Sequence, residues 1–202
     1  VFLILLFGTF LGWINGYVTV KTGVHSFIVT LATMSIYFGF MTVLTQAQSF
    51  KYLPEAFTDI GSMKLFYKYV SPLLLLSLFT GCILFYLFKF TDIGRKLIAA
   101  GANPIAAELS GISVNRMFVY CHMLSGFLAA VAGIMVTMRI GAAIPSIAGH
   151  LGFDWLLPAF LAPVLGGTLL SGGKITVFGT ILGALLVSLI TNGLLLLDVG
   201  IF

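Results

Sequence analysis

Long apolar runs separated by short polar stretches make up most of this chain of 202 residues. A helix that crosses the hydrocarbon core of a membrane needs about 20 mostly apolar residues. Five stretches meet this requirement, and they lie at residues 1–20, 26–45, 69–88, 117–138 and 175–197. A sixth apolar stretch, at residues 155–170, is shorter and contains Pro158 and Pro163. The pattern therefore predicts an all-α fold, a polytopic transmembrane helical bundle that forms a single domain over residues 1–202.

The composition supports a membrane protein, since 60% of the residues are hydrophobic and only 8% are charged. Soluble domains carry about 25% charged residues, so a water-soluble fold is not expected. The 23 glycines fit the close approach of helices in lipid. Small residues recur at four-residue spacing, which predicts three packing faces: Gly8, Gly12 and Gly16; Ala129 and Gly133; Gly179 and Gly183.

The two ends of the chain predict a fragment of a longer membrane protein. Val1 begins inside an apolar run with no initiator Met and no basic region before it, unlike a signal peptide. The chain stops at Phe202 without a polar tail. We therefore expect truncation at both ends. Cys82 and Cys121 lie in apolar runs without metal-ligand spacing, which predicts small buried hydrophobic residues.

Basic residues indicate which polar segments face the cytoplasm, because Lys and Arg are enriched there. If residues 155–170 count as a full crossing, alternation divides the basic residues into two sets. The larger set is Lys21, Lys89, Arg95, Lys96, Arg116 and Lys174, and the smaller set is Lys51, Lys64, Lys68 and Arg139. The larger set predicts a cytoplasmic position for the polar connector at residues 89–116. The net charge of +4 is thereby explained by basic membrane edges rather than by nucleic-acid binding.

The connector at residues 89–116 has the features of a shaped docking element, and we predict that it is a coupling region that receives force from another subunit. Its Asn103-Pro104 step predicts a short helix, with Asn as the cap and Pro at the first helical position. Glu108 is then expected in the early turns of this helix, where a negative charge suits the helix dipole.

The other small and charged residues of the connector complete this prediction. Ala106 and Ala107 would leave a slim surface for insertion into a cleft, and Gly101 and Gly111 would permit turns on either side of the helix. Arg95 and Lys96 are expected to pair with acidic groups on the partner or with lipid headgroups. The predicted coupling residues are Gly94, Arg95, Gly101, Asn103, Pro104, Ala106, Ala107, Glu108, Ser110 and Gly111.

Ionisable residues are missing from the middle of every predicted span. Proton-coupled transporters usually need such a group, because a buried ionisable side chain carries the coupling. The chain therefore fits a transporter that moves neutral cargo and draws its energy from elsewhere. Sodium coupling through backbone carbonyls stays open.

Catalytic and metal-binding patterns are weak in this sequence. His122 and Ser125 lie three residues apart, but nucleophilic catalysis also needs an oxyanion hole and an orienting group. His150 and Asp154 offer no third metal ligand. The SGGK turn at residues 171–174 lacks the first Gly and the final hydroxyl of a phosphate-binding loop. We therefore expect no nucleotide site, no metal site and no cofactor in this chain.

The short apolar stretch is the best candidate for a translocation pathway. Pro158 and Pro163 should break it, because proline removes a backbone donor and kinks a helix. It ends at Gly166 and Gly167. Irregular backbone at membrane depth must be buried in protein or line a wet cavity. We predict that these four residues belong to the pathway; an ordinary kinked helix is the alternative.

Five sequence blocks carry a resemblance to a known family. They are SFIVTLATMSIYFG at 26–39, LPEAFTDIGSMK at 53–64, GRKLIAAGANPIAAELSGISVNRM at 94–117, LSGFLAAVAGIMVTMRIGAAIPSIAG at 124–149, and VLGGTLLSGGKITVFGTILGALL at 164–186. Together they resemble the permease subunits of bacterial ATP-binding-cassette importers of the ribose and monosaccharide type. The blocks span most of the chain in the family's order.

The resemblance implies a fold, a location and a set of partners. The fold would be the larger, vitamin-B12-importer-like permease bundle in the bacterial inner membrane. Two permease subunits would form the pathway, an ATPase subunit that binds ATP and Mg²⁺ would contact the connector, and a periplasmic protein would deliver sugar. The permease itself would not be an enzyme. Three alternatives stay open: a branched-chain amino acid permease of the same architecture, a secondary transporter or channel acting alone, and a fragment without function.

Overall fold

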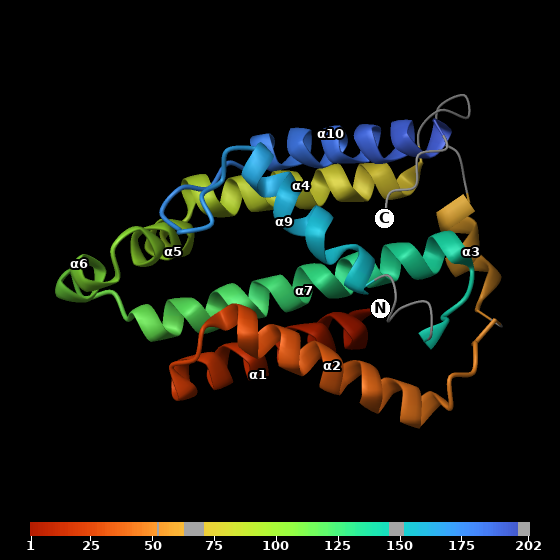
Figure 1. Ribbon diagram of the computed structural model, residues 1–202, viewed down its shortest axis with the longest axis horizontal. Helices are drawn as coiled ribbons and strands as arrows, with labels where there is room; N and C mark the ends of the chain where they lie inside the picture. Colours follow the sequence, from red (N-terminus) through yellow and green to blue (C-terminus); the bar gives the residue numbers. More distant parts are fainter. Residues whose placement is uncertain (52, 63–70, 146–151, 198–202) are drawn as a thin grey trace. The chain divides into compact units, whose positions relative to one another are not determined.

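The computed structural model describes residues 1–51, 53–62, 71–145 and 152–197, and these are almost entirely helical (Figure 1). The helices are α1 (Phe2–Thr22), α2 (Ser26–Thr45), α3 (Glu55–Ser62), α4 (Pro72–Phe90), α5 (Asp92–Ala102), α6 (Pro104–Leu109), α7 (Val114–Ile140), α9 (Leu156–Leu165) and α10 (Val177–Leu196). The chain divides into two compact units. The first unit is Val1–Ser77 with Ser113–Gly149, and the second is Leu78–Ile112 with His150–Phe202.

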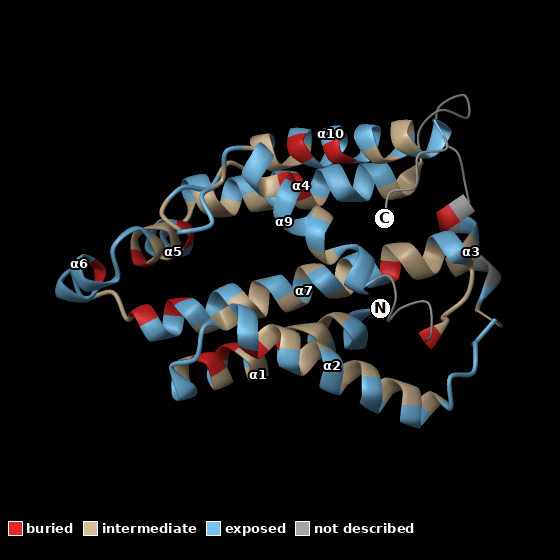
Figure 2. Ribbon diagram, viewed as in Figure 1, coloured by how far each residue is buried: buried red, intermediate tan, exposed pale blue. Residues whose placement is uncertain are grey.

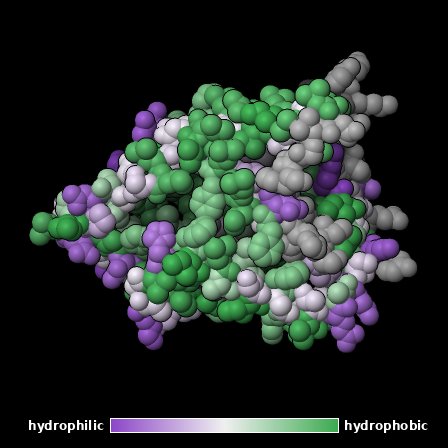
Figure 3. All heavy atoms as spheres, viewed as in Figure 1, coloured by the Kyte–Doolittle hydropathy of each residue, from purple (hydrophilic) through white to green (hydrophobic). Residues whose placement is uncertain are grey.

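Among the described residues, five helices are long and apolar enough to cross a membrane, as the sequence predicts. They are α1, α2, α4, α7 and α10. Few of their residues are buried, and hydrophobic side chains dominate the face drawn in Figure 3 (Figures 2 and 3). Such apolar surface suits hydrocarbon, where helices are held together by close packing rather than by exclusion from water.

In the first unit, α1 packs along α7 through the stripe of glycines that the sequence predicts. A Cβ atom placed on Gly8 would lie 2.6 Å from the Cβ of Ala130, and one on Gly16 would lie 2.9 Å from the Cα of Val119. Gly12, between them, faces the α7 backbone equally closely. No side chain fits in these gaps, so the two helices meet backbone to backbone.

Two polar contacts join α2 to the same unit. The Oγ of Ser26 lies 2.8 Å from the Nε2 of His122 on α7. The hydroxyl of Tyr37 donates a hydrogen bond of 3.3 Å to the Oδ1 of Asn15 on α1. Each contact joins residues far apart in the chain, so α2 is fixed against both of its neighbours by uncharged groups.

The polar segment before α4 differs from its prediction as a loop, because α3 forms within it. The helix follows Pro54, whose carbonyl accepts hydrogen bonds from the nitrogens of Phe57 and Thr58 at 2.9 and 3.3 Å. Gly61 then lies directly against the backbone of Met138 at the end of α7. The absence of a side chain at Gly61 lets this short helix pack on α7. The part of the predicted loop that carries Lys64 and Lys68 lies outside the described residues.

In the second unit, α9 and α10 pack through small residues. Gly179 lies directly against the backbone of Gly166, and Gly183 lies against the carbonyl of Ala162. The predicted packing face of Gly179 and Gly183 is therefore confirmed. A side chain at either position would push the two helices apart.

Two smaller predictions are wrong. Nothing lies within 4 Å of a Cβ placed on Gly133, and Ala129 is exposed, so this pair is no packing face within the described chain. The residue that α7 uses is Gly126, whose Cβ would lie 3.0 Å from the Cα of Gly12. Cys82 and Cys121 are free and exposed rather than buried, because each lies on an outward face of its helix.

Candidate functional site

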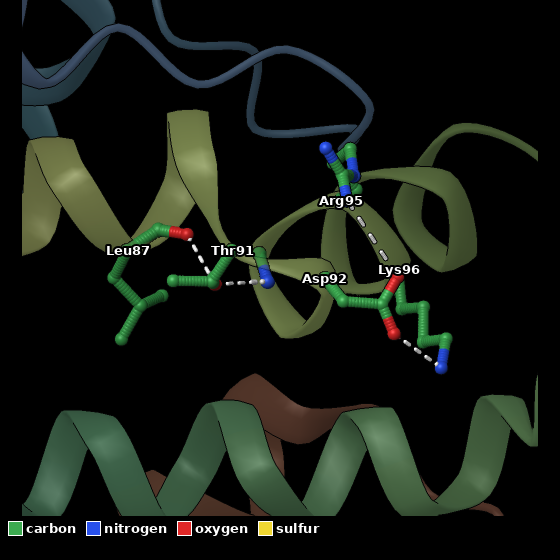
Figure 4. A network of polar contacts seen from close by, with 6 residues as sticks. Leu87, Thr91, Asp92, Arg95 and Lys96 are labelled. Atoms are coloured by element: carbon green, nitrogen blue, oxygen red, sulfur yellow. Dashed lines mark hydrogen bonds and ion pairs between the residues drawn. The ribbon is translucent and has the colours of Figure 1, made fainter.

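Thr91 turns the chain from α4 into α5, the first helix of the connector. Its hydroxyl donates to the carbonyl of Leu87 at 2.6 Å and accepts from the backbone nitrogen of Gly94 at 3.1 Å (Figure 4). The second bond is an N-cap, which satisfies a donor that the helix itself leaves free. Gly94 is buried, and a Cβ there would lie 2.6 Å from the Cα of Phe88. Gly94 therefore allows α5 to turn closely against the end of α4.

The charges at the start of α5 pair with one another. The Nζ of Lys96 lies 2.6 Å from a carboxylate oxygen of Asp92, and the guanidinium of Arg95 lies 3.9 Å from the other (Figure 4). The hydrogen bond from Lys96 holds the pKa of the Asp92 carboxyl below its usual range. All three side chains are largely exposed, so the pairs contribute little to stability. The charges stay accessible to a partner or to headgroups.

The predicted start of the short helix is confirmed. Asn103 is the N-cap of α6, and its side-chain oxygen accepts a hydrogen bond of 3.1 Å from the backbone nitrogen of Ala106. Pro104 occupies the first helical position, where a missing N–H costs no hydrogen bond. The backbone nitrogen of Asn103 also bonds the carbonyl of Ala99, so α5 ends where α6 begins.

The end of α6 is closed by a Schellman motif. Gly111 adopts a φ of 79°, a left-handed conformation that glycine enters at no steric cost. The nitrogen of Ile112 bonds the carbonyl of Ala107 at 2.9 Å, and the nitrogen of Gly111 bonds that of Glu108 at 2.9 Å. The hydroxyl of Ser110 donates to another carbonyl of the same turn at 2.9 Å. Gly111 therefore makes the predicted turn, and α6 is capped at both ends.

Two predicted roles in the connector are wrong. Glu108 is the fifth of six residues in α6, so it lies in the last turn, where the helix dipole does not favour a negative charge. Gly101 lies inside α5 rather than in a turn, because α5 continues to Ala102. A Cβ on Gly101 would lie 3.2 Å from the backbone nitrogen of Gly173. The glycine at this position serves a close contact, which the sequence did not reveal.

The exposed face of α6 is more apolar than predicted. Ala106 is exposed as expected, but Ala107 is buried, with only 4% of its surface accessible. Ile105 and Leu109 are 73% and 86% exposed. They are four residues apart, which places them on the same side of the helix. The four-residue spacing of the two aliphatic residues was a signal in the sequence for this pair, and the prediction based on the alanines did not include it.

The candidate pathway segment is a short helix followed by irregular backbone. α9 has 10 residues, or about 15 Å, which is half of the roughly 30 Å that a full crossing needs. Counting it as a complete helical span is therefore wrong. Pro158 lies in the first turn and breaks nothing, whereas Pro163 lies in the last turn, just before the helix ends.

The irregular backbone after α9 is satisfied by threonine side chains. Gly167 ends the helix with a φ of 81°. The hydroxyl of Thr176 donates to the carbonyl of Gly166 at 2.6 Å, and the nitrogen of Thr176 donates to the hydroxyl of Thr168 at 3.1 Å. The hydroxyl of Thr168 also lies 3.3 Å from that of Thr180 on α10. This network satisfies backbone groups that the end of the helix leaves without partners.

The glycine turn at 171–174 lies at the connector's end of the second unit. A Cβ on Gly172 would lie 2.5 Å from the carbonyl oxygen of Gly101, and the loop that carries it runs beside α5 in Figure 1. The same relationship holds between the helices, because Gly81 of α4 contacts Ile181 near the start of α10, the helix that follows this turn. Lys174 therefore lies on the same side as the connector, as the sequence predicts, although α9 alone does not cross.

His122 makes a polar contact between two helices. The Nε2 of His122 is hydrogen-bonded to Ser26 of α2, so this histidine joins helices. No group of three or more His, Cys, Asp or Glu residues that could hold a metal ion occurs in the described part of the chain. The predicted pair of His150 and Asp154 cannot be placed, since His150 lies outside the described residues.

The profile of one protein family, described as the permease component of branched-chain amino acid transport systems, matches residues 1–199. The chain belongs to this family. The permease is 39% identical over 201 residues to the ribose import permease protein of Haemophilus influenzae, an alignment that covers 98% of this chain and 60% of the relative. No solved structure matches it.

Further relatives agree with this assignment. The D-allose transport system permease protein of Escherichia coli is 35% identical over 194 residues, covering 96% of this chain and 58% of the relative. The ribose import permease protein of Bacillus subtilis is 35% identical over 188 residues, covering 93% and 57%. The chain thus spans about three fifths of the length of these relatives. With its five apolar helices, it is a multi-pass permease of the bacterial inner membrane.

Proposed function

We propose that this permease is the transmembrane subunit of an ATP-driven importer that moves a monosaccharide of the ribose type by alternating access. The relatives named above are permeases for ribose and allose, which supports a sugar over a branched-chain amino acid. A sugar carries no charge, and the described spans hold no acidic or basic residue at their centres that would be needed to balance one.

The observation that carries the proposal is the exposed apolar pair on α6. Ile105 and Leu109 project from a helix that is capped at both ends, so their positions are fixed before any partner arrives. Burying an aliphatic side chain of this size contributes about 1.5–3 kcal/mol. Two such side chains, on the same side of a short helix, form an apolar surface that an ATPase subunit buries when it binds. Ala106, beside them, keeps the helix slim.

The remaining parts of the importer follow from this assignment. The ATPase binds ATP and Mg²⁺, so this chain needs no cofactor. A periplasmic sugar-binding protein delivers the cargo at the opposite face, and a second permease subunit completes the pathway. Arg95 and Lys96 remain exposed at the start of α5 and meet acidic groups of the ATPase or headgroups of the lipid.

The irregular segment after α9 contributes to the pathway. Pro163 lies in the last turn of α9 and Gly167 follows its end with a positive φ, so the backbone becomes irregular there. Irregular backbone in a membrane protein is tolerated where it is buried or wet. Gly166 packs against the backbone of Gly179, which holds the start of this segment against α10. Pro158 lies in the first turn of the same helix, where a missing N–H costs no hydrogen bond.

Reconstitution tests the proposal directly. The permease is expressed from its full gene and purified together with the ATPase and the binding protein that neighbouring genes encode. The complex is then inserted into lipid vesicles. Labelled ribose, allose, galactose and leucine are then offered with the binding protein, with and without ATP. We expect uptake of a monosaccharide that requires ATP hydrolysis and persists in the presence of a proton ionophore.

Two results would reject the proposal, each in favour of a different alternative. Uptake of leucine in preference to every sugar would assign the chain to amino acid import. Sugar uptake that continues without ATP and stops with an ion-gradient uncoupler would identify a secondary transporter. Removal of both side chains of the α6 pair should abolish uptake if the ATPase grips there.

A further inference from the structure

The glycine turn between α9 and α10 contacts the end of α5 through backbone atoms and the methyl group of Ala102. A Cβ on Gly172 would lie 2.5 Å from the carbonyl oxygen of Gly101, and one on Gly173 would lie 2.9 Å from the Cα of Ala102. From the other side, a Cβ on Gly101 would lie 3.2 Å from the nitrogen of Gly173. Contacts this close have no flexible side chain that could absorb a displacement, so the two segments must move together or separate.

The α5 end of this contact leads directly into α6, the docking helix that we propose the ATPase binds. Ala102 is the last residue of α5, and Asn103 follows it as the cap of α6. The backbone of Asn103 is tied to α5 by its bond to Ala99 and to α6 by the bond that its carbonyl accepts from Ala107. A push on α6 is thereby delivered to Ala102 without an intervening flexible linker.

The other end of the contact is braced against the segment after α9. The nitrogen of Leu169 donates to the carbonyl of Lys174 at 3.2 Å, and the nitrogen of Gly172 donates to the carbonyl of Leu169 at 3.1 Å, so the turn is closed on itself. Thr168 and Thr176 then tie the base of the turn to the carbonyl of Gly166. A displacement of the turn therefore reaches the C-terminal end of α9.

Conformational freedom explains why the turn consists of two glycines. Gly172 and Gly173 have φ angles of 92° and 84°, which side chains rarely adopt. Many turns need one such residue for their shape alone. Here both glycines also lie so close to the end of α5 that a Cβ atom on either would clash with it. The two positions therefore require glycine both for their backbone angles and for this contact.

We propose that Gly101, Gly172 and Gly173 are positioning residues that pass movement of α6 to the pathway segment at the end of α9. This inference rests on the proposed ATP-driven function and names the route by which the ATPase acts on the gate. The route lies wholly within the second unit, from Asn103 through the three glycines to Gly166. It predicts that opening this contact separates ATP hydrolysis from sugar movement.

Two matched pairs of variants test the route in the reconstituted importer. Gly172→Ala places a methyl group against α5 at a positive φ, and Gly23→Ala is its control, with a φ of 69° and nothing within 4 Å. Gly101→Val pushes on the turn from within a helix that has ordinary backbone angles. Its control is Gly133→Val, in a helix and with open space around it.

Two rates are measured for each variant: ATP hydrolysis stimulated by loaded binding protein, and sugar uptake. For Gly172→Ala and Gly101→Val we expect stimulated hydrolysis to remain while sugar moved per ATP falls about fivefold or more, the lower end of typical coupling between sites. Both controls should keep the wild-type ratio. A merely structural role would lower hydrolysis and uptake in proportion and leave the ratio unchanged.

The result that overturns the route is an unchanged ratio in both contact variants. A ratio that falls equally in the Gly23→Ala control would also overturn it, because glycine strain alone would then account for the effect. Wild-type vesicles separate this failure from failure of the proposed function. If the wild-type importer shows no ATP-dependent sugar uptake, the function itself is rejected, and the route is rejected with it.

Discussion

The side-chain oxygen of Asn103 accepts a hydrogen bond of 3.1 Å from the backbone nitrogen of Ala106, and this bond starts α6 immediately after α5 ends. The bond fixes the direction in which the exposed apolar pair projects. A helix of six residues is too short to be stable by itself, so its orientation depends on its caps.

Replacing the cap tests this dependence. Asn103→Ala should destabilise α6 by about 1 kcal/mol, whereas Asn103→Ser, which keeps a capping oxygen, should cost far less. We expect stimulated ATP hydrolysis and uptake to fall together in the alanine variant and to recover in the serine variant. Equal activity in both variants would mean that the cap does not orient the docking helix.

The apolar pair on α6 should carry the affinity for the ATPase. Leu109→Ala removes most of an aliphatic side chain that is 86% exposed in this chain. If the ATPase buries it, the loss of about 1.5–3 kcal/mol should weaken binding roughly tenfold or more. Binding of the purified ATPase to the permease in nanodiscs gives the dissociation constant.

The control for this prediction lies in the same connector. Ile93 on α5 is 54% exposed, and Ile93→Ala makes the same kind of truncation away from α6. We expect wild-type affinity for this variant. A loss of affinity at Ile93 equal to that at Leu109 would show that the whole connector, and not α6, forms the docking surface.

The glycine stripe of α1 should contribute to the stability of the fold. Gly12→Ala would place a methyl group 3.1 Å from the Cα of Met123 and closer still to the carbonyl of His122. Overpacking of this kind costs about 1–3 kcal/mol. Thermal unfolding in detergent, followed by size-exclusion chromatography, should show a lower Tm. Gly39→Ala on α2, with nothing within 4 Å, should leave the Tm unchanged or raise it slightly.

The hydrogen bond between α2 and α7 should contribute little to stability. Ser26→Ala removes the partner of His122, and such contacts between membrane helices average about 0.6 kcal/mol. Ser35→Ala, which removes a hydroxyl bonded only within α2, is the control. If Ser26→Ala instead abolished uptake while the Tm stayed constant, this pair would be part of the pathway rather than a joint between helices.

The sequence predicted what depends on local pattern. The spans at α2 and α10 follow from hydrophobic runs of sufficient length, and the start of α6 follows from the Asn103-Pro104 step. The Gly8, Gly12 and Gly16 stripe was readable because helical spacing alone places small residues on one face.

Features that depend on tertiary contact were not predicted. Gly101 has no local signal that separates a turn glycine from a contact glycine, and only its approach to Gly173 assigns the role. The burial of Ala107 and the exposure of Leu109 depend on how α6 rests on α5. The glycine pair at 179 and 183 predicted a close contact but could not name Gly166 and Ala162 as its partners.

The central claim is that α6 faces the cytoplasm and is covered by the ATPase, and cysteine labelling tests it most directly. Ala106 is exposed, so Ala106→Cys in a chain with Cys82 and Cys121 replaced by Ser offers a single thiol at the docking face. A thiol reagent that cannot cross the membrane should not label this cysteine in intact cells. It should label the cysteine in inverted membrane vesicles, whose cytoplasmic face is outward, and label it less when the ATPase is added. Labelling from outside intact cells would contradict the account.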